Sequence, residues 1–409
     1  MTRVMSTETG GRGRPGGEQA TVTTLRLRNR AAVLRHVILA RQTTRADIAR
    51  ECGLSMASAA NLVADLAAEG LVHETGTVAS GGGRPIALIS PQPEGAYTIG
   101  ADIGERGVAV ELFDLSMTAV DQEFRGGRAE EDPGAIGDDL RAAVDALRAR
   151  NAERWPRLLG IGLAMPGIVE TDGTGRQTLY AQSLRWPPVP IDELLPADVP
   201  VFADNGGKTQ AKAEQWFGAA RGVEHAVVAL LGRGVGVGLI QEGQLQAGAH
   251  SSAGEWGHTK VERNGRLCRC GGRGCVEAYV GASAMLAAWA ERGGVFEGTG
   301  WRAVCQLLDA AGAGDAAAAA VVDDAIGVLG NALANLVNLT NPQRIVVGGW
   351  VGIRLMGALA DRIDAAIRAN SLDRPGSQYE LCPSTFGGDT VAIGAAILPL
   401  EQLIREPRG

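Results

Sequence analysis

The chain has 409 residues and a mass of 42.4 kDa, of which 45% are hydrophobic, 21% charged and only 4% aromatic. This length and apolar content exclude disorder throughout and allow two or three domains with their own cores. The formal net charge is −7, yet residues 1–50 hold ten Arg against three acidic residues and the rest of the chain is acidic. A basic N-terminal segment on an acidic body is typical of a small DNA-binding unit joined to a larger soluble domain.

Nothing in the sequence predicts export or membrane insertion. There is no run of eighteen or more apolar residues, and the N-terminal segment lacks the apolar centre of a signal peptide. We therefore expect a cytoplasmic protein with no membrane partner. The six Cys are too few for a disulfide framework, and three of them lie within eight positions, which favours metal binding in a reducing compartment.

The N-terminal part divides into a tail and a set of helices. Residues 1–24 are rich in Gly, Arg, Ser and Thr without apolar periodicity and predict a flexible basic tail. Residues 25–92 then contain three helical patterns, of which the second begins at a capping box of Thr44 and Asp47 and the third at Ser55. The apolar positions that define the first and third patterns are Ala31, Leu34, Val37, Ile38, Ala59, Leu62, Val63 and Leu66.

A hairpin pattern follows the third helix. Leu71 and Val72 predict a short strand, residues 80–85 a glycine-rich loop, and residues 86–89 a returning strand. Helices separated by a tight glycine turn and followed by a hairpin predict a winged helix-turn-helix domain. A three-helix bundle without a DNA role is the alternative, and the basic first half together with Arg84 on the hairpin loop disfavours it.

The third helix is the expected DNA reader, because the N-terminal residues of a recognition helix contact base edges in the major groove. Asn61 suits a bidentate contact with adenine, and Arg84 suits a narrow, A/T-rich minor groove. The predicted recognition residues are Ser55, Ala57, Ser58, Asn61 and Arg84, and the candidates for phosphate contacts are Arg26, Arg28, Arg30 and Arg45.

Residues 93–409 carry a different pattern, with short β runs separated by glycine turns and helices, as in α/β chains. Residues 97–104 predict a buried strand that ends in Asp-x-Gly, and residues 159–167 a strand that runs into a Pro-Gly turn. A further strand leads into the glycine-rich residues 232–238, where glycine allows the backbone to approach a ligand closely.

One group of residues in this region predicts a metal site. His258 is followed by Cys268, Cys270 and Cys275, with glycines between them that let the chain curl around an ion. One imidazole and three thiolates suit tetrahedral zinc, and a site with all four positions filled by protein is structural rather than hydrolytic. A chance cluster of buried thiols is the alternative.

The sequence around these residues resembles a known family. It combines AGEWGH at residues 253–258, a Cys-x-Cys-Gly-x-x-Gly-Cys-x-Glu run that ends at Glu277, and GRGVGVG at residues 232–238. These motifs resemble the ROK family of sugar kinases and sugar-responsive repressors, and the likeness extends from residue 97 to about residue 400; Gly83-Arg84-Pro85 resembles the repressor branch. The resemblance implies an actin-like, two-lobed ATPase-type α/β fold, with a sugar cleft between the lobes and a structural zinc loop.

The resemblance also implies the sugar contacts. Carboxylates accept paired hydrogen bonds from adjacent sugar hydroxyls, and an imidazole bound to zinc through one nitrogen is fixed in tautomer and orientation. Ser183 stands where the family often has a sugar-binding Asn, and Pro166-Gly167 is expected to line the cleft. The implied sugar-binding residues are Asn205, Glu255, His258 and Glu277.

The chain departs from the family's kinases where they perform chemistry. Their general base, an Asp that follows an Asn and lies eight residues before a Glu, falls on Gly206 when counted from Glu214. We therefore expect no catalytic residues and no enzyme, although a shift of register could bring Asp204 to that position. The departures on the phosphate side are Glu105 and Arg106 after Asp102-Ile103-Gly104, Arg233 in place of Thr, and Trp350 after Gly349.

Taken together, these features predict a transcriptional regulator, with a repressor favoured over an activator. It would bind double-stranded operator DNA as a homodimer or homotetramer, associate with the nucleoid when bound, and respond to a monosaccharide or sugar derivative. The helix expected over residues 317–338 is a candidate dimer surface, although its Ala-rich faces fit core packing equally well. The alternative function is an ATP-dependent sugar kinase with an attached DNA-binding domain.

Overall fold

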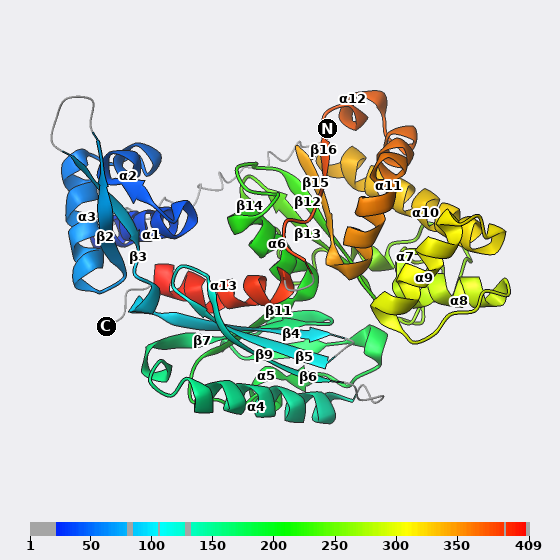
Figure 1. Cartoon of the computed structure of the whole chain (residues 1–409), viewed down its shortest axis with the longest axis horizontal. Coiled ribbons are helices and arrows are strands. Elements are labelled where there is room, and N and C mark those ends of the chain that lie inside the picture. Colours follow the sequence, from blue (N-terminus) through cyan, green and yellow to red (C-terminus); the bar gives the residue numbers. More distant parts are fainter. Residues whose placement is uncertain (1–21, 80–84, 105–106, 127–131, 388–389, 406–409) are drawn as a thin grey trace, which may run out of the picture.

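The computed structural model describes residues 22–79, 85–104, 107–126, 132–387 and 390–405 (Figure 1). Most of the expected tail, and Arg84 on the hairpin loop, lie outside these residues. The first helix begins at Val22, so residues 22–24 belong to that helix and not to the tail.

The N-terminal unit consists of three helices and a small antiparallel sheet in which β3 lies between β1 and β2. In Figure 1 this unit lies at one end of the molecule, beside the C-terminal helix. Its elements in chain order are α1 (Val22–Ala40), β1 (Thr43–Thr44), α2 (Arg45–Glu51), α3 (Met56–Ala68), β2 (Val72–Val78) and β3 (Ile86–Pro91).

The helix starts of this unit follow from local side-chain chemistry. The Thr44 hydroxyl accepts a hydrogen bond from the Asp47 amide at 3.1 Å, which confirms Thr44 as the N-cap of the predicted capping box, and the Ser55 hydroxyl accepts from the Ser58 amide at 3.1 Å. Gly53, between α2 and α3, has a φ of +64°, which few residues other than glycine adopt. The four apolar residues predicted for the third helix are all buried in α3.

The body has two lobes, each built on a five-stranded sheet. When the strands of each sheet are numbered along the chain, both sheets have the order 3-2-1-4-5, with the first three strands antiparallel and the rest parallel. The first sheet contains β4 (Tyr97–Gly104), β5 (Gly107–Asp114), β6 (Ala119–Gly126), β7 (Leu158–Met165) and β11 (Val201–Asn205). The second contains β12 (Ala226–Leu231), β13 (Val235–Gln241), β14 (Gln244–Leu245), β15 (Arg344–Gly348) and β16 (Glu380–Pro383).

Helices cover both sheets, and a small sheet and short helical turns extend the first lobe. The helices are α4 (Pro133–Arg150), α5 (Ile191–Leu194), α6 (Gly206–Phe217), α7 (Glu277–Val280), α8 (Ala282–Glu291), α9 (Gly300–Gly312), α10 (Ala316–Thr340), α11 (Gly349–Asn370), α12 (Asp373–Gly376) and α13 (Thr390–Arg405). The small sheet contains β8 (Ile168–Thr171), β9 (Gln177–Tyr180) and β10 (Val189–Pro190); the 3₁₀ turns are η1 (Pro93–Gly95), η2 (Trp155–Arg157), η3 (Gln182–Leu184) and η4 (Trp256–His258).

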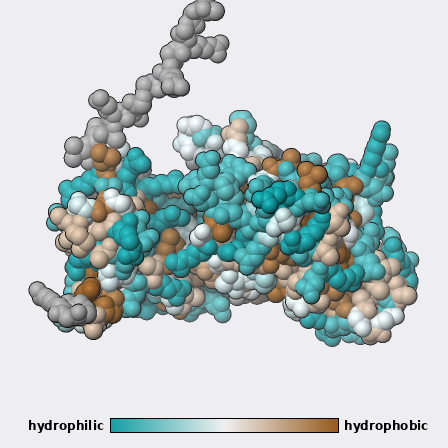
Figure 2. Space-filling view, turned by 90° about the horizontal axis from the view of Figure 1, so that it is seen from above, coloured by the Kyte–Doolittle hydropathy of each residue, from teal (hydrophilic) through white to brown (hydrophobic). Residues whose placement is uncertain are grey.

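Helix α10 is a core helix of the second lobe. Within the described residues it is the one helix long and apolar enough to cross a membrane, but half of its most apolar window is buried inside the protein. Its buried side chains include Val321, Ile326, Leu329 and Leu333. On the face shown in Figure 2, hydrophobic residues are scattered among hydrophilic ones. Much of the α10 surface that was a candidate for a dimer contact is therefore buried inside the protein.

The C-terminal helix α13 lies between the first sheet and α6 (Figure 1). A Cβ atom at Gly100 of β4 would lie 1.9 Å from the carbonyl oxygen of Ala392, and one at Gly162 of β7 would lie 1.8 Å from that of Ala395. A Cβ at Gly394 would likewise lie 1.8 Å from the carbonyl oxygen of Thr209 in α6. Glycine at these positions allows α13 to pack against its neighbours at backbone distance.

The N-terminal unit shares one hydrophobic core with α13. Leu34 and Ile38 of α1 belong to the same buried cluster as Leu400 and Leu403 of α13 and Trp216 of α6. The cluster also contains Phe113, Leu115 and Met117 at the end of the first sheet. The small unit is therefore packed onto the body through apolar contact as well as through its chain connection.

The position of Arg30 shows that one expected phosphate contact is wrong. Its side chain is buried, pairs with Glu69 and donates to the carbonyl oxygen of Leu403 at 3.3 Å. Arg26 pairs with Asp65 at 2.7 Å and Arg45 with Glu74 at 2.8 Å. Among the four candidates Arg26 and Arg28 are exposed, whereas Arg30 serves the contact between the N-terminal unit and α13.

Candidate functional site

The first part of the site is the junction of β11 and α6. Asn205 ends β11 and caps α6: its side-chain oxygen accepts from the Gly207 amide at 2.8 Å, and its side-chain nitrogen donates to the carbonyl oxygen of Gly167 at 2.9 Å. The next residue is Gly206, and a Cβ atom there would meet nothing closer than Leu230 at 3.7 Å. The position therefore has room for a side chain but carries no carboxylate.

Asp204 does not take over that position. It lies in β11 in regular register with Ala164 of β7, and its side chain accepts from the Asn205 amide at 2.8 Å. Lys208 lies 3.7 Å away on the first turn of α6. Burial raises the pKa of Asp204, while the charge of Lys208 opposes that shift. The strand shows no shift of register that would move this carboxyl to the place of Gly206.

Three of the four expected sugar contacts gather on the second lobe. Glu255 directly precedes η4, His258 is its last residue, and Glu277 begins α7. The Glu277 carboxylate accepts from the Val235 amide at 3.1 Å and lies 3.7 Å from the sulfur of Cys268. His258 Nε2 lies 3.3 Å from the hydroxyl of Ser183, which belongs to the first lobe. The fourth expected contact, Asn205, lies across the site at the start of α6.

Glycines and a buried tryptophan hold this segment against the second sheet. A Cβ at Gly254 would lie 2.5 Å from the carbonyl oxygen of Val237, and one at Gly257 would lie 2.0 Å from that of Val235. Between them, the indole of Trp256 donates to the carbonyl oxygen of Ala332 in α10 at 3.2 Å. The AGEWGH motif thus anchors the backbone, so that Glu255 and His258 are presented from a fixed turn.

The His258 and cysteine side chains form one compact cluster. The donor atoms of His258, Cys268, Cys270 and Cys275 all lie within 4.8 Å of one another. The sulfurs of Cys270 and Cys275 are 3.8 Å apart, close to the spacing of about 3.8 Å that a tetrahedral ion with metal–sulfur bonds of about 2.3 Å requires. His258 Nδ1 is also 3.8 Å from the sulfur of Cys268. This donor set could hold a tetrahedral metal ion.

The loop that carries these cysteines is shaped by glycine. Gly274 has a φ of +72°, and a Cβ there would lie 1.7 Å from the carbonyl oxygen of Glu262. Lys260, outside the predicted ligand set, places its ammonium 2.7 Å from the sulfur of Cys275, and this contact raises the pKa of Lys260. A cation at this distance offsets the negative charge that three thiolates bring together.

Lys208 and Glu214 are two buried charged residues whose contacts the sequence did not reveal. Lys208 is buried and donates to the carbonyl oxygen of Ser251, close to the motif that carries Glu255. Glu214 is fully buried, and its carboxylate accepts from the Ser384 hydroxyl at 2.5 Å and from the Ala219 amide at 2.6 Å. Helix α6 thus carries the polar contacts that join β11 to two loops of the second lobe.

The phosphate side of the site is described only in part. Glu105 and Arg106 lie outside the described residues. A Cβ atom at Gly232 would lie 3.1 Å from the indole nitrogen of Trp350, so this ring lies against the glycine-rich loop that also contains Arg233. A large side chain therefore stands beside the loop where the family resemblance would put a nucleotide.

The predicted DNA-reading residues share one exposed surface. Ser55, Ala57, Ser58 and Asn61 are all exposed at the N-terminal half of α3. The Ser55 and Ser58 hydroxyls lie 2.9 Å apart, so they contact each other as well as the helix backbone. Arg84 lies outside the described residues, between the ends of β2 and β3.

Residues 98–402 match the family model described as "ROK family". The chain belongs to the ROK family. The expected α/β chain with the fold of ROK sugar kinases is thereby confirmed. The matched residues include nearly all of both lobes, α13 as far as residue 402, and the candidate sugar and metal residues.

Relatives of two kinds resemble the chain. It is 26% identical to the xylose repressor of Bacillus spizizenii, over 92% of this chain and 96% of the repressor. It is 30% identical to the glucokinase of Halalkalibacterium halodurans, over 75% of this chain and 96% of that enzyme. The crystal structure of a ROK transcriptional regulator, a homolog of the Escherichia coli MLC protein, covers 93% of this chain and 97% of its own, with a TM-score of 0.73 and 24% identity.

Glu255 provides a test of the site. Burial raises the pKa of its carboxyl group, and the charges of His258 and Lys208 oppose this shift without cancelling it. The fold therefore favours the protonated group, and this stabilising contribution is lost as the pH rises through the raised pKa. We expect Glu255→Gln to raise the thermal midpoint of the sugar-free protein at pH 7. The gain should shrink as the pH falls towards about 4.3, where the wild-type carboxyl is also protonated.

The measurement is thermal unfolding between pH 4.5 and 8, with Glu224→Gln as the control because Glu224 is exposed. A lower midpoint for Glu255→Gln at pH 7 would show that Lys208 and His258 stabilise the ionised carboxylate by more than burial costs it.

Proposed function

We propose that this protein is a sugar-responsive transcriptional regulator, acting as a repressor of genes for sugar uptake or breakdown. It works in the cytoplasm and is associated with the nucleoid when bound to DNA. The observation that carries the proposal is the continuous hydrophobic core through which a three-helix unit with an exposed α3 is packed onto a ROK body. The likeness to the xylose repressor, which extends over nearly the whole chain, supports the same function.

The N-terminal unit acts as a winged helix-turn-helix domain for double-stranded operator DNA. Helix α3 enters the major groove with Ser55, Ala57, Ser58 and Asn61, and these short side chains contact few base edges. Arg84, on the loop between β2 and β3, enters the adjacent minor groove. Because one helix with few contacts supplies little discrimination, we propose that a homodimer or homotetramer binds paired half-sites.

The sugar lies in the cleft against Glu255, His258, Glu277 and Asn205. Two carboxylates can accept hydrogen bonds from neighbouring hydroxyls, and the site is buried enough to strengthen them. His258 presents Nε2 to the cleft, where Ser183 already lies 3.3 Å from it. The ligand class that fits this arrangement is a monosaccharide or a close derivative.

A structural zinc ion held by His258 Nδ1 and the thiolates of Cys268, Cys270 and Cys275 fits the donor set. Zinc would supply a rigid tetrahedral anchor with no open coordination position. Lys260 offsets the net negative charge of three thiolates on a divalent ion. With one ring nitrogen held in this way, the other nitrogen of His258 keeps one orientation towards the sugar.

The cleft does not transfer phosphate in this proposal. Loss of a positioned general base costs about 10²- to 10⁴-fold in rate, and Gly206 offers none. Asp204 is engaged with Lys208 and the Asn205 amide, and Trp350 lies against the glycine-rich loop. The alternative is an ATP-dependent sugar kinase with an attached DNA-binding unit, which the 30% identity to a glucokinase favours.

Helix α6 provides the route from the sugar to the DNA-binding unit. It begins at the cleft with Asn205 as its cap and ends at Trp216 and Phe217, about 18 Å away at 1.5 Å per residue. The guanidinium of Arg35 in α1 lies 5.1 Å from the centre of the Trp216 ring. A small movement of the cap would therefore reach α1 through one rigid helix.

The first experiment measures operator binding and phosphate transfer by the same full-length preparation. We expect promoter fragments from sugar operons to bind at nanomolar to micromolar protein concentration, and one member of a sugar panel to weaken that binding. ATP consumption with the same panel should stay at background. Turnover at about 1 s⁻¹ or faster would establish the kinase instead, and a footprint upstream of the promoter elements would indicate an activator.

Metal removal tests the zinc assignment. We expect about one zinc per chain in the wild type and in the control Cys305→Ser, and loss of zinc in Cys270→Ser. Sugar affinity should fall by about tenfold or more in Cys270→Ser, because the orientation of His258 is lost, while sugar-free operator binding changes by less than about twofold. Unchanged sugar affinity after loss of the metal would contradict the role given to the cluster.

The proposed route is tested by a double-mutant cycle of Arg35→Met and Trp216→Leu. A cation–π pair contributes about 0.5–1 kcal/mol at exposed sites, so we expect the sugar-dependent change in operator affinity to fall by about two- to fivefold in each variant and no further in the double variant. The control is Arg148→Met, since Arg148 lies 5.0 Å from the Trp155 ring in the first lobe. If the variants weakened operator binding without sugar as much as they weakened the sugar response, the contact between Arg35 and Trp216 would only hold the N-terminal unit in place.

A further inference from the structure

A cavity of about 410 Å³ lies at the seam between the lobes, outside the set of sugar contacts. We call it the outer pocket. One wall is the end of β9 and the segment that follows it, with Tyr180, Gln182, Arg185 and Trp186, and the other is the cysteine loop at residues 269–271. Its volume falls in the range of about 300–1,000 Å³ typical of small-molecule sites.

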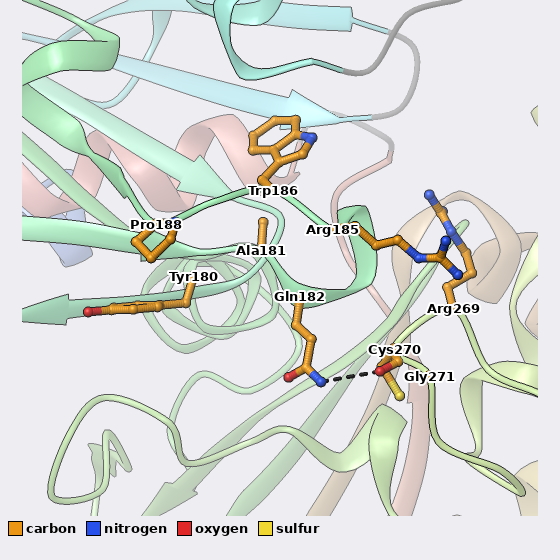
Figure 3. Close-up of a pocket in the computed structure, with 9 residues that line it drawn as sticks. All are labelled: Tyr180, Ala181, Gln182, Arg185, Trp186, Pro188, Arg269, Cys270 and Gly271. Atoms are coloured by element: carbon orange, nitrogen blue, oxygen red, sulfur yellow. Dashed lines mark hydrogen bonds between the residues drawn. The ribbon is translucent and has the colours of Figure 1, made fainter.

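Figure 3 shows that the outer pocket has two chemically different ends. Tyr180 and Pro188 lie at one end, and the guanidinium groups of Arg185 and Arg269 lie at the other. Trp186 also lines the pocket. Aromatic rings pack against the C–H faces of sugar rings, and guanidinium groups bind phosphate through paired hydrogen bonds.

The charge of the outer pocket is one-sided. It contains two arginines, one from each lobe, and none of the described residues that line it is acidic. An anion bound at this end of the cavity would be attracted by both guanidinium groups. Among the described residues, Arg185 also has no ion-pair partner.

The backbone conformation of Arg185 also supports a ligand site. This residue has a φ of +57° at the end of η3, and a non-glycine residue in the left-handed region costs roughly 1–2 kcal/mol. Such strain is often found at ligand-binding positions. Here the strained residue directly follows η3 (Gln182–Leu184) and lines the pocket.

The outer pocket adjoins the sugar cleft without sharing its ligands. The side chain of Gln182 donates to the carbonyl oxygen of Cys270 at 3.2 Å and so joins the two walls (Figure 3). Its neighbour Ser183 faces His258 instead. A molecule in the outer pocket would therefore hold the two lobes together beside the cleft.

We propose that the outer pocket is a second ligand site, separate from the sugar cleft, that binds a phosphorylated monosaccharide. The phosphate lies between Arg185 and Arg269, and the sugar ring packs on Trp186 and Tyr180. By bridging the lobes, the bound phosphate ester biases the same lobe arrangement that the sugar in the cleft biases. The binding part of this inference does not depend on the proposed regulatory function.

The test is calorimetric titration of the full-length protein with paired probes: glucose, glucose 6-phosphate, N-acetylglucosamine, N-acetylglucosamine 6-phosphate, xylose, xylulose 5-phosphate and inorganic phosphate. We expect at least one phosphate ester to bind about tenfold or more tightly than both inorganic phosphate and its neutral partner. Arg185→Gln and Arg269→Gln should each weaken this binding by about tenfold or more. Arg273→Gln is the matched control, because Arg273 lies on the same loop but does not line the pocket.

Glu255→Gln separates the two sites. Phosphate-ester binding that survives this substitution supports the second site, even if no sugar on the panel binds the cleft and the regulatory proposal fails. Phosphate-ester binding lost in Glu255→Gln but retained in Arg185→Gln would place the ligand in the cleft and overturn the inference. Binding of inorganic phosphate as tight as that of every ester, or no binding that depends on Arg185, would also overturn it.

Discussion

Backbone-to-backbone packing of α13 is the contact on which the rest of the structure depends. The helix lies against Gly100 and Gly162 of the first sheet on one side and places its own Gly394 against α6 on another. Its last turns enter the core of the N-terminal unit through Leu400, Leu403 and Ile404. Because interiors are close-packed, a helix held at this distance cannot move alone, and a shift of the first lobe must displace it together with its neighbours.

The cleft combines retained and altered chemistry within a few residues of α6. Asn205 caps the helix, and the Glu214 carboxylate holds the loop at Ser384. Between them, Gly206 leaves room but offers no proton acceptor, and Lys208 adds a buried cation. Binding of a sugar needs fixed hydrogen-bond partners, whereas phosphate transfer also needs a base and an open nucleotide loop. In the function proposed above, these residues serve the first task and not the second.

The sequence predicted those features whose causes are local. The caps at Thr44 and Ser55, the buried face of α3 and the cluster of His258 with three cysteines follow from spacing along the chain, and the structure contains them. The prediction of the actin-like fold depended on motifs of the family, because residue spacing alone does not reveal a two-lobed topology. Arg30, Lys208 and the place of α13 could not be predicted, because their partners lie far away in the sequence: Arg30 meets Leu403, and Lys208 meets Ser251. The metal ion, the DNA contacts and the sugar contacts stay predictions.

The buried Arg30 limits how such proteins can be rearranged. Its guanidinium donates hydrogen bonds to Glu69 of its own unit and to the carbonyl oxygen of Leu403 near the other end of the chain. The hydrogen bonding of this buried cation therefore depends on both units. A chimera that joined these three helices to a foreign sugar-binding body would keep the Glu69 carboxylate but remove the second acceptor of this guanidinium, at a cost of about 1–3 kcal/mol if the group stayed buried. Domain shuffling in this architecture is therefore expected to transfer the first ninety or so residues together with the C-terminal helix, or to replace this arginine with an apolar residue.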